Sequence, residues 1–227
     1  MHVLLFDIDG TLLKSGGAGQ AAMERALESL FDVSAPTDGI QAAGRTDFAI
    51  TSELLEYHGV DSSSDNRQRF LDRYLSHLPE ELSSRDGLVL PGVPELLASL
   101  SKRATVHLGL LTGNLQRGAA IKLAHYRMAD YFQFGGFGDH HRSRDDVAHA
   151  AAEAAARHLE RTPDSIWVIG DTPADIQCGR AIGATVIAVS TGIYSAEVLA
   201  EAGPDYLFES FSDVELVLSI LPGELPR

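Results

Sequence analysis

The sequence has almost no cysteine and no strongly basic tract. Cys178 is the single cysteine among 227 residues, so neither an intrachain disulfide nor a multi-cysteine zinc site can form. Lys and Arg total 18 against 32 Asp and Glu, which gives a formal net charge of -14. Nucleic acids and anionic membranes attract basic surfaces, so this acidity argues against both as partners. A small anionic substrate stays compatible, because local positive groups or a metal ion can overcome the global field.

Long apolar runs are also missing. No window holds the roughly 18 uncharged apolar residues of a transmembrane helix. The apolar stretch 3–6 meets Asp7 and Asp9 too soon to belong to a signal peptide. We therefore expect a soluble, cytoplasmic protein. With 44% apolar residues, the chain can bury a core as one domain or as one domain with a smaller insert.

Short aliphatic runs alternate with helical patterns over most of the chain. The runs are nearly unbroken, as in strands covered on both faces, and predict strands at 2–8, 105–112, 165–170, 185–190 and 206–208. Helical patterns lie between them at 94–101, 116–125, 147–160 and 175–182. This alternation predicts an α/β fold with a doubly wound parallel sheet, a Rossmann-like core.

Residues 16–85 differ from the rest, because they carry helical patterns and no convincing strand. The patterns lie at 20–31, 47–58 and 66–78, separated by a Pro36–Gly39 turn and a polar segment at 61–66. We expect a helical insert after the first strand, with a core made of residues 1–15 and 86–227.

The first predicted strand ends in Asp7-Ile8-Asp9-Gly10-Thr11. Sites in open α/β sheets form at the carboxyl ends of strands, and alternation puts Asp7 and Asp9 on one side of the extended chain. Two adjacent carboxylates repel unless a positive group lies near, and Mg²⁺ prefers oxygen ligands. One carboxylate could then be a nucleophile and the other a general acid/base. The alternative is a turn with two solvated aspartates.

Two further strands end in polar motifs. Thr112, Gly113 and Asn114 offer a hydroxyl, a backbone N–H and an amide that suit phosphate oxygens, although they could simply cap the next helix. Asp171 and Asp175 are spaced so that both can face one point and ligate a metal, although they could simply be helix N-terminal acids. Chance placement of all three motifs at strand ends is improbable.

The three motifs together resemble a known family. DIDGT at 7–11, LTGN at 111–114 and GDTPAD at 170–175 are similar to motifs I, II and IV of the haloacid dehalogenase-like hydrolase superfamily. The motif order and the helical insert, which resembles the family's cap, extend the likeness over nearly the whole chain. Its phosphoglycolate phosphatase-like members are the most similar branch, and the second Asp of motif I is typical of phosphotransferases in this family.

The resemblance implies a role for each matching position. Asp7 would be the nucleophile that forms an aspartyl-phosphate, and Asp9 the general acid/base. Asp7, the backbone carbonyl of Asp9, and Asp171 would bind Mg²⁺, with Asp175 supporting that site. The phosphoryl group would contact three residues of the second motif, namely Thr112, Gly113 and Asn114.

One departure concerns the lysine that the family usually has ahead of the helix before motif IV. No lysine occurs at 138–146, but Arg142 lies nearest the expected spacing and Arg144 is its rival. Either guanidinium could neutralise the phosphate and Asp7, or be an ordinary surface arginine. In the cap, Arg45 could bind a second anionic group of the substrate, while Thr46 or Asp47 could simply cap the next helix.

These observations favour a magnesium-dependent phosphatase of a small phosphomonoester. A phosphosugar mutase on the same scaffold would share every motif, and a non-catalytic binding protein of this fold is a third possibility. Two weaker patterns point elsewhere. The glycines at 17 and 19 match a dinucleotide fingerprint but sit too far from the strand, and Asp139, His140, His141 and His149 lack the second cluster of a transition-metal site.

Overall fold

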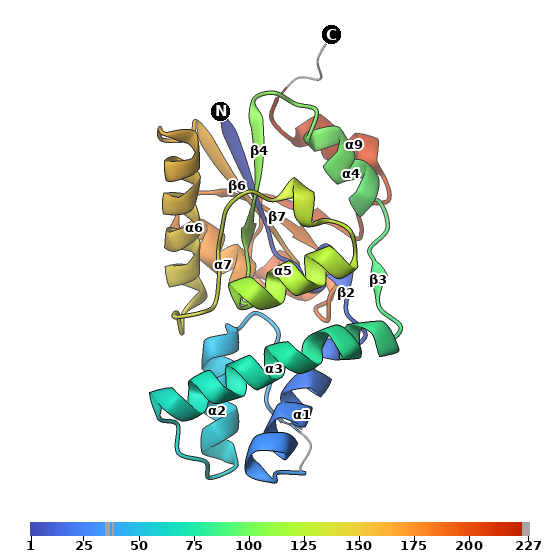
Figure 1. The fold of residues 1–227 in the computed structure, drawn as a ribbon. Coiled ribbons are helices and arrows are strands. Elements are labelled where there is room, and N and C mark those ends of the chain that lie inside the picture. Colours follow the sequence, from blue (N-terminus) through green and yellow to red (C-terminus); the bar gives the residue numbers. More distant parts are fainter. Residues whose placement is uncertain (35–36, 38, 224–227) are drawn as a thin grey trace.

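A six-stranded parallel sheet forms the centre of the protein (Figure 1), whose computed structural model describes residues 1–34, 37 and 39–223. The strand order is β5-β4-β1-β6-β7-β8. The strands are β1 His2–Phe6, β4 Val106–Leu111, β5 Gly135–Gly136, β6 Ser165–Gly170, β7 Thr185–Val189 and β8 Tyr206–Phe208. The predicted doubly wound α/β fold is confirmed. The short β5 has no apolar run and was not predicted.

Helices cover both faces of the sheet because strand residues alternate between two apolar clusters. Leu4 and Phe6 of β1 pack with residues of α4, α5 and α9, whereas Val3 and Leu5 pack with α6. The helices around the sheet are α4 Val93–Leu100, α5 Gln116–His125, the 3₁₀ turn η1 Ala129–Tyr131, α6 Arg144–Leu159, α7 Pro173–Ala181, α8 Ala196–Glu201 and α9 Val214–Ile220. The sequence did not predict α8 and α9, which follow the last chemical motif.

Three helices form a separate layer, which we call the helical unit. They are α1 Ala18–Phe31, α2 Asp47–Tyr57 and α3 Ser64–Ser84. Their apolar faces share one cluster, which includes Leu27, Leu54, Phe70 and Leu78. The predicted helices are present, and α3 runs on past Pro79 to Ser84. Of the predicted turn at 36–39, Pro36 and Asp38 lie outside the described residues.

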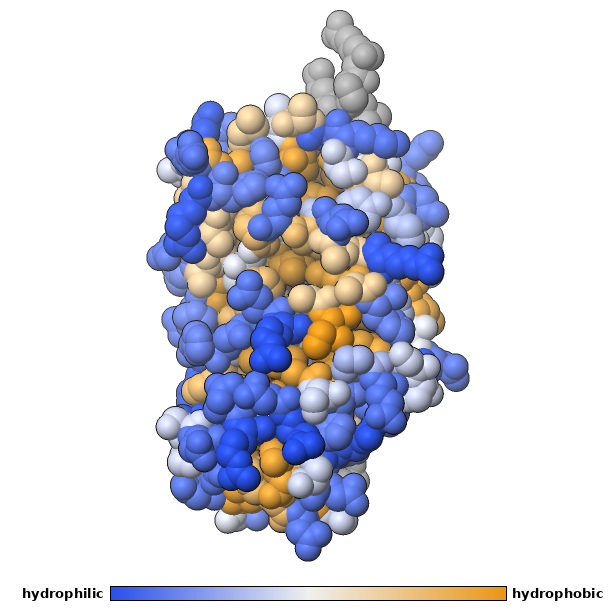
Figure 2. Space-filling model, in the orientation of Figure 1, coloured by the Kyte–Doolittle hydropathy of each residue, from blue (hydrophilic) through white to orange (hydrophobic). Residues whose placement is uncertain are grey.

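The helical unit lies against the carboxyl ends of the strands. The chain enters it through β2 Leu13–Lys14 and returns through β3 Leu88–Val89, which pair antiparallel. Figure 1 shows the unit beneath the sheet, with α3 alongside α5. Leu115, just before α5, joins the apolar cluster of the unit. Figure 2 shows a mostly hydrophilic face with apolar side chains at the level where the two layers meet.

No helix in the described ranges combines the length and apolar character needed to cross a membrane.

Candidate active site

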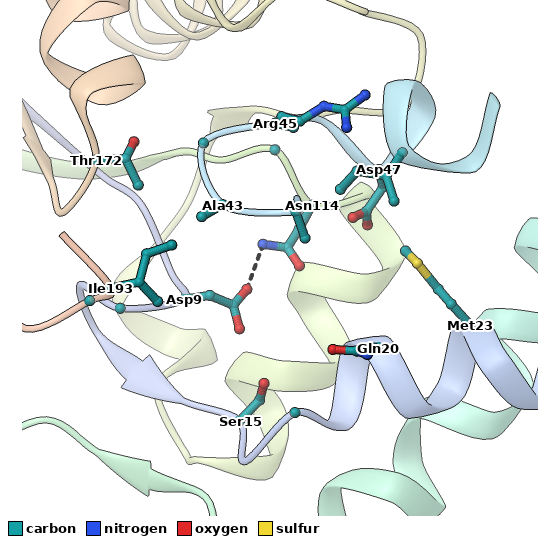
Figure 3. Close-up of a pocket in the computed structure, with 18 of the residues that line it drawn as sticks. Asp9, Ser15, Gln20, Met23, Ala43, Arg45, Asp47, Asn114, Thr172 and Ile193 are labelled. Carbon is teal, nitrogen blue, oxygen red and sulfur yellow. Dashed lines mark hydrogen bonds between the residues drawn. The ribbon is translucent and has the colours of Figure 1, made fainter. Parts of the chain in front are cut away.

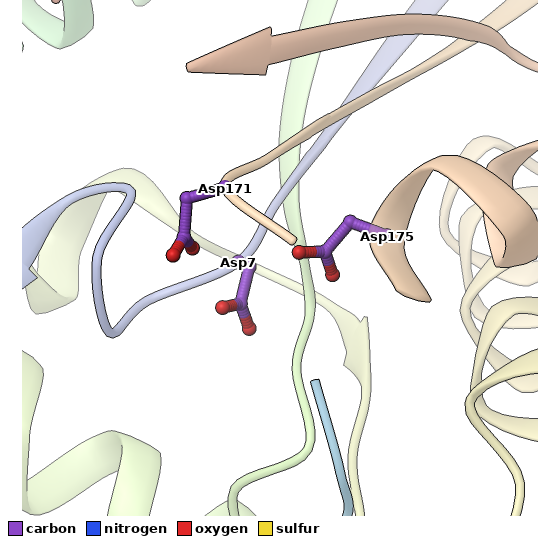
Figure 4. A group of neighbouring side chains, drawn as sticks. All are labelled: Asp7, Asp171 and Asp175. Carbon is purple, nitrogen blue, oxygen red and sulfur yellow. The ribbon is translucent and has the colours of Figure 1, made fainter. Parts of the chain in front are cut away.

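Three aspartates converge where the strands β1 and β6 end. Asp7 directly follows β1, Asp171 directly follows β6, and Asp175 lies in the first turn of α7. Each offers a carboxylate oxygen, and the three oxygens lie within 4.8 Å of one another (Figure 4). The side chains of Asp7 and Asp171 are therefore close enough to share one cation.

Local hydrogen bonds hold two of these carboxylates in place. Thr11 donates from Oγ1 to Asp171 Oδ1 at 2.9 Å. Thr172 and Asp175 form a capping box at the start of α7, in which Asp175 Oδ2 accepts from the Thr172 N–H at 3.1 Å and from its hydroxyl at 2.7 Å. Gly10 has φ 88°, and a Cβ there would lie 2.3 Å from Asp171 Oδ2, so the approach requires glycine.

Negative charge exceeds positive charge around these three aspartates. Burial, together with the charge of Asp175, raises the pKa values of both Asp7 and Asp171. Arg144 compensates in part, because its Nη1 lies 3.6 Å from Asp7 Oδ1 and its Nη2 pairs with Asp175 Oδ1. A divalent cation would relieve the remaining repulsion. An all-oxygen donor set of this kind fits Mg²⁺.

A second charged group surrounds Asp9. Lys122 of α5 donates from Nζ to Asp9 Oδ2 at 2.5 Å and to Asn114 Oδ1 at 2.6 Å. Asn114 itself donates from Nδ2 to Asp9 Oδ2 at 2.9 Å. Desolvation raises the pKa of Asp9, but Lys122 and Asn114 outweigh it, so the pKa lies below its usual value. Asp9 is thus clamped by an amide and an ammonium group.

Lys122 was missed by the sequence reasoning, which treated 116–125 only as a helix. Its side chain is just 5% exposed. Gly118, Ala119 and Leu123 are also buried, so Lys122 shares the inward face of α5. A lysine on an otherwise apolar helix face was the available signal, because buried lysines need an anionic partner.

The second motif joins the sheet to the helical unit. Thr112 is fully buried, and its hydroxyl accepts from the Asn114 amide at 2.8 Å. Gly113 accepts from the Asp47 N–H at 2.7 Å, and a Cβ on Gly113 would lie 1.9 Å from the carbonyl oxygen of Arg45. The loop before α2 therefore rests directly on residue 113, which requires glycine at that position.

The structure separates the two candidate arginines. Helix α6 begins at Arg144, three residues before the predicted start, with Ser143 as its N-cap. This places Arg144 on the inward side, where its side chain is 7% exposed and contacts Asp7. Arg142 is exposed, and its guanidinium lies 5.5 Å from the ring centroid of Phe48. Arg144 is thus the arginine that the fold brings to the aspartates.

Two other groups from the sequence analysis have different surroundings. Arg45 pairs with Glu53 and donates to the Gln41 carbonyl at 3.1 Å. Asp139 accepts from the Gln116 N–H at 2.9 Å at the start of α5. Among the residues described, three or more potential metal ligands gather only at the Asp7 cluster, so the histidines near Asp139 do not form a second group.

A cavity of about 550 Å³ lies between the sheet and the helical unit (Figure 3). We call the lining residues that come from the sheet and its surrounding helices the floor of the cavity. The floor includes Asp7, Asp9, Lys122, Arg144 and Asp171. We call the lining residues that come from the helical unit, including the loop between α1 and α2, the roof of the cavity. The roof is largely apolar. The roof includes Met23, Ile40, Ile50, Leu54 and Tyr74.

The sequence profile of the haloacid dehalogenase-like hydrolase family matches residues 4–189, which is most of the chain. The chain belongs to this family. The matched region contains residues 4–6 of β1, the whole of β4 and β6, and all three motifs.

This haloacid dehalogenase-like hydrolase is similar to curated phosphatases. It is 25% identical over 226 residues to a phosphoglycolate phosphatase from Salmonella typhi, covering 92% of this chain and 89% of the relative. It is 26% identical over 219 residues to one from Synechococcus elongatus, with coverage of 94% and 95%. The predicted phosphoglycolate phosphatase-like branch is confirmed, as is the prediction of a phosphoric monoester hydrolase of the haloacid dehalogenase-like type.

Solved structures agree on the fold of this hydrolase. CbbY from Rhodobacter sphaeroides, in complex with phosphate, superposes with a TM-score of 0.74 at 18% identity, covering 93% of this chain and 95% of that one. A hydrolase from Pseudomonas syringae gives 0.67 at 23% identity, with coverage of 98% and 100%. The core and the helical unit thus follow one known architecture.

Proposed function

We propose that this hydrolase cleaves a small phosphomonoester in two steps, through an aspartyl-phosphate on Asp7, with Mg²⁺ as cofactor. The observation that supports this most is the convergence of Asp7, Asp171 and Asp175 within 4.8 Å, beside Arg144 and beneath a cavity. We further propose that residues 16–85 act as a cap over a core of residues 1–15 and 86–227.

In the first step, a carboxylate oxygen of Asp7 attacks phosphorus. The bond from phosphorus to the ester oxygen breaks, and the leaving oxygen takes a proton from Asp9. Asp9 is ionised in the substrate-free protein because Lys122 and Asn114 favour its anion. The charge of the arriving phosphate raises the affinity of Asp9 for a proton, since a nearby like charge favours the neutral carboxyl group.

In the second step, water attacks the phosphorus of the aspartyl-phosphate. Asp9, now ionised, accepts a proton from that water, and the Asp7 carboxylate departs with its electron pair to release inorganic phosphate. Lys122 and Asn114 hold the Asp9 carboxylate in one orientation for both proton transfers. Lys122 is therefore proposed as a positioning residue.

Charge neutralisation supplies most of the proposed catalysis. Arg144 faces the Asp7 carboxylate, so its guanidinium can contact the transferring phosphoryl group. The Thr112 hydroxyl and the backbone N–H of Gly113 are proposed to hold the same group, with Asn114 beside them. Asp7, the Asp9 carbonyl and Asp171 would hold Mg²⁺, which supplies positive charge to the phosphoryl oxygens, while Asp175 fixes Arg144 and the α7 terminus.

The direct test is phosphate release from p-nitrophenyl phosphate with and without Mg²⁺. We expect EDTA to abolish turnover and added Mg²⁺ to restore it. Asp7→Asn should lower kcat by at least about a thousandfold, because an amide is a poor nucleophile. Measuring released inorganic phosphate also separates hydrolysis from a mutase reaction, which yields an isomer instead.

Asp146→Asn is the matched control, because Asp146 is an exposed acid on α6. It should keep wild-type turnover. Acid-quenched samples analysed by mass spectrometry should carry a phosphoryl group on the peptide with Asp7, and an Asp7→Asn protein with wild-type turnover would refute the nucleophile assignment.

A further inference from the structure

The cavity is much larger than its reacting end. Its volume of about 550 Å³ falls within the range of roughly 300–1,000 Å³ that holds drug-sized ligands. A phosphoryl group occupies only the floor beside Asp7 and Arg144. The remaining space extends into the helical unit, so the leaving group of the ester determines what fills it.

Apolar side chains from four segments line most of that remaining space, which also borders Gln20, Thr37 and Asp47. Met23 comes from α1, Ile50 and Leu54 lie one turn apart on α2, Tyr74 comes from α3, and Ile40 lies in the intervening loop. We call these five residues the leaving-group chamber. Figure 3 shows the Met23 side chain directed toward the cavity from α1. An apolar wall stabilises apolar surface that is withdrawn from water and offers nothing to a charged group.

The chamber connects directly to the proposed acid/base. A Cβ placed on Gly19 would lie 3.9 Å from Lys122 Nζ and 3.9 Å from the Tyr74 hydroxyl. Tyr74 therefore borders the same point as the lysine that clamps Asp9. Its burial, together with the charges of Asp47 and Asp9, raises the pKa of Tyr74, so the chamber presents a neutral phenol there.

The cations around the cavity are already paired. Arg144 forms ion pairs with Asp7 and Asp175. Lys122 pairs with Asp9, and Arg45 pairs with Glu53. Figure 3 shows the Arg45 guanidinium directed away from Asp9. Of the cations that line the cavity, Lys14 is the one without an ion pair in the described part of the chain, and it lies exposed on β2. A second anion on the substrate would have to break an existing pair or reach Lys14.

From this geometry we infer that the hydrolase prefers phosphomonoesters whose leaving group is uncharged and largely apolar, with that group held in the leaving-group chamber. The inference rests on the proposed function and specifies its substrate class. It sets this chain apart from an enzyme for a short phosphorylated acid, because such a substrate would leave the chamber empty and its carboxylate without a dedicated partner.

The test compares kcat/KM for ethyl, butyl and hexyl phosphate with that for phosphoglycolate. The alkyl esters have closely similar leaving oxygens, so their difference reports apolar contact alone. We expect kcat/KM to rise about threefold to fourfold for each buried methylene until the chamber is filled. Phosphoglycolate should be a poorer substrate than butyl phosphate. A flat alkyl series, or phosphoglycolate as the best of the four, would overturn the inference.

Two variants locate the effect in the protein. Met23→Gln keeps the unbranched shape but adds an amide, and should reduce the hexyl-to-ethyl preference by roughly tenfold. Lys102→Met should leave the alkyl series unchanged, because Lys102 is exposed and does not line the cavity. An unchanged alkyl preference in Met23→Gln, or an equal loss of it in Lys102→Met, would contradict the assignment.

A binding measurement separates this inference from the proposed function. The same esters are titrated by calorimetry into the Asp7→Asn protein with Mg²⁺ present. Affinity that rises with chain length supports the chamber even if the wild-type protein turns over none of the esters, an outcome that would overturn the proposed function alone. Affinity independent of chain length, together with turnover of p-nitrophenyl phosphate, would overturn the chamber alone.

Discussion

The floor and the roof of the cavity are built on opposite principles. The floor carries charged side chains, most of them buried, and each is held by named partners, such as Asp9 between Lys122 and Asn114. The roof consists mainly of apolar side chains from the helical unit, whose helices share an apolar cluster of their own. Charges in a dry site act strongly on a developing charge, whereas apolar contacts act in proportion to area. Floor changes should therefore alter chemistry by orders of magnitude, and roof changes should alter selectivity more gently.

Among the cations of the floor, Arg144 should give the largest effect when its guanidinium is removed. We expect Arg144→Met to lower kcat/KM for p-nitrophenyl phosphate by about 10²–10³-fold, because the transferring phosphoryl group loses a buried positive partner. Arg144→Lys should recover part of the rate, since a point charge stays but the fork geometry is lost. Steady-state kinetics with saturating Mg²⁺ provide the measurement.

Arg142→Met is the control for Arg144, because Arg142 lies two residues away but is exposed over Phe48. It should stay within about twofold of wild type. Losing Arg144 leaves Asp7 and Asp175 without their buried cation, so circular dichroism must show that Arg144→Met is folded. Equal losses in the two variants would break the distinction between the buried and the exposed arginine.

Lys122→Met should have the next largest effect, about 10–100-fold on kcat, with a smaller change in KM. The reason is that Asp9 loses the group that orients it and keeps it ionised. Because Lys122 lowers the pKa of Asp9, its removal should raise that pKa. The acidic limb of the kcat profile, which follows ionisation of Asp9 as a base, should then move to higher pH.

Lys122→Arg and Lys102→Met complete this experiment. The arginine keeps a positive charge and should restore the position of the acidic limb, even if the rate is only partly recovered. Lys102 is exposed and makes no ion pair with another described residue, so Lys102→Met should match wild type. A Lys122→Met protein with an unshifted acidic limb would show that Lys122 does not act through Asp9.

The sequence predicted the floor better than the roof, for a physical reason. Asp7, Asp171 and Thr112 follow the ends of apolar strands, and parallel strands bring their carboxyl ends to one edge. Local pattern therefore determined their meeting in space. Lys122 was not predicted as a site residue, because the pattern of a helix indicates which face is buried but not which distant anion contacts that face. Only the packing of α5 against the turn after β1 brings Lys122 to Asp9.

The competition between Arg142 and Arg144 shows a second limit. Spacing alone favoured Arg142, because the helix was expected to begin at 147. Ser143 caps the helix earlier, with its side chain accepting from the Asp145 N–H, and this turns Arg144 inward. A shift of three residues along a helix start exchanges the exposed and buried positions. The roof was harder still to predict from the sequence, because the shape of the cavity depends on how three helices pack together, and no sequence motif indicates that packing.

One side chain links roof to floor and gives the prediction with the smallest effect on turnover. Asp47, in the first turn of α2, is buried, and its Oδ2 accepts from the Leu115 N–H at 2.9 Å. Burial raises the pKa of Asp47 to about 6, although Lys122 and the Leu115 N–H oppose the shift. The ordinary value is near 4. The folded protein therefore binds a proton between about pH 4 and pH 6 that the unfolded chain has already lost.

The sign of the pH dependence follows from that proton. Where the folded state binds more protons, the free energy of unfolding falls as the pH rises. Asp47 should thus reduce stability progressively from about pH 4 to pH 6, by up to roughly 3 kcal/mol at about 1.4 kcal/mol for each pKa unit, and add no further slope above that window. Asp47→Asn keeps an acceptor for Leu115 but cannot titrate. Urea unfolding of the metal-free proteins across this range should show a shallower decline in Asp47→Asn, with kcat within about fivefold of wild type. If the free energy of unfolding depends on pH in the same way in both proteins, the pKa of Asp47 is not raised by burial. The contact between the start of α2 and Leu115 would then hold the roof to the floor less tightly than its geometry implies.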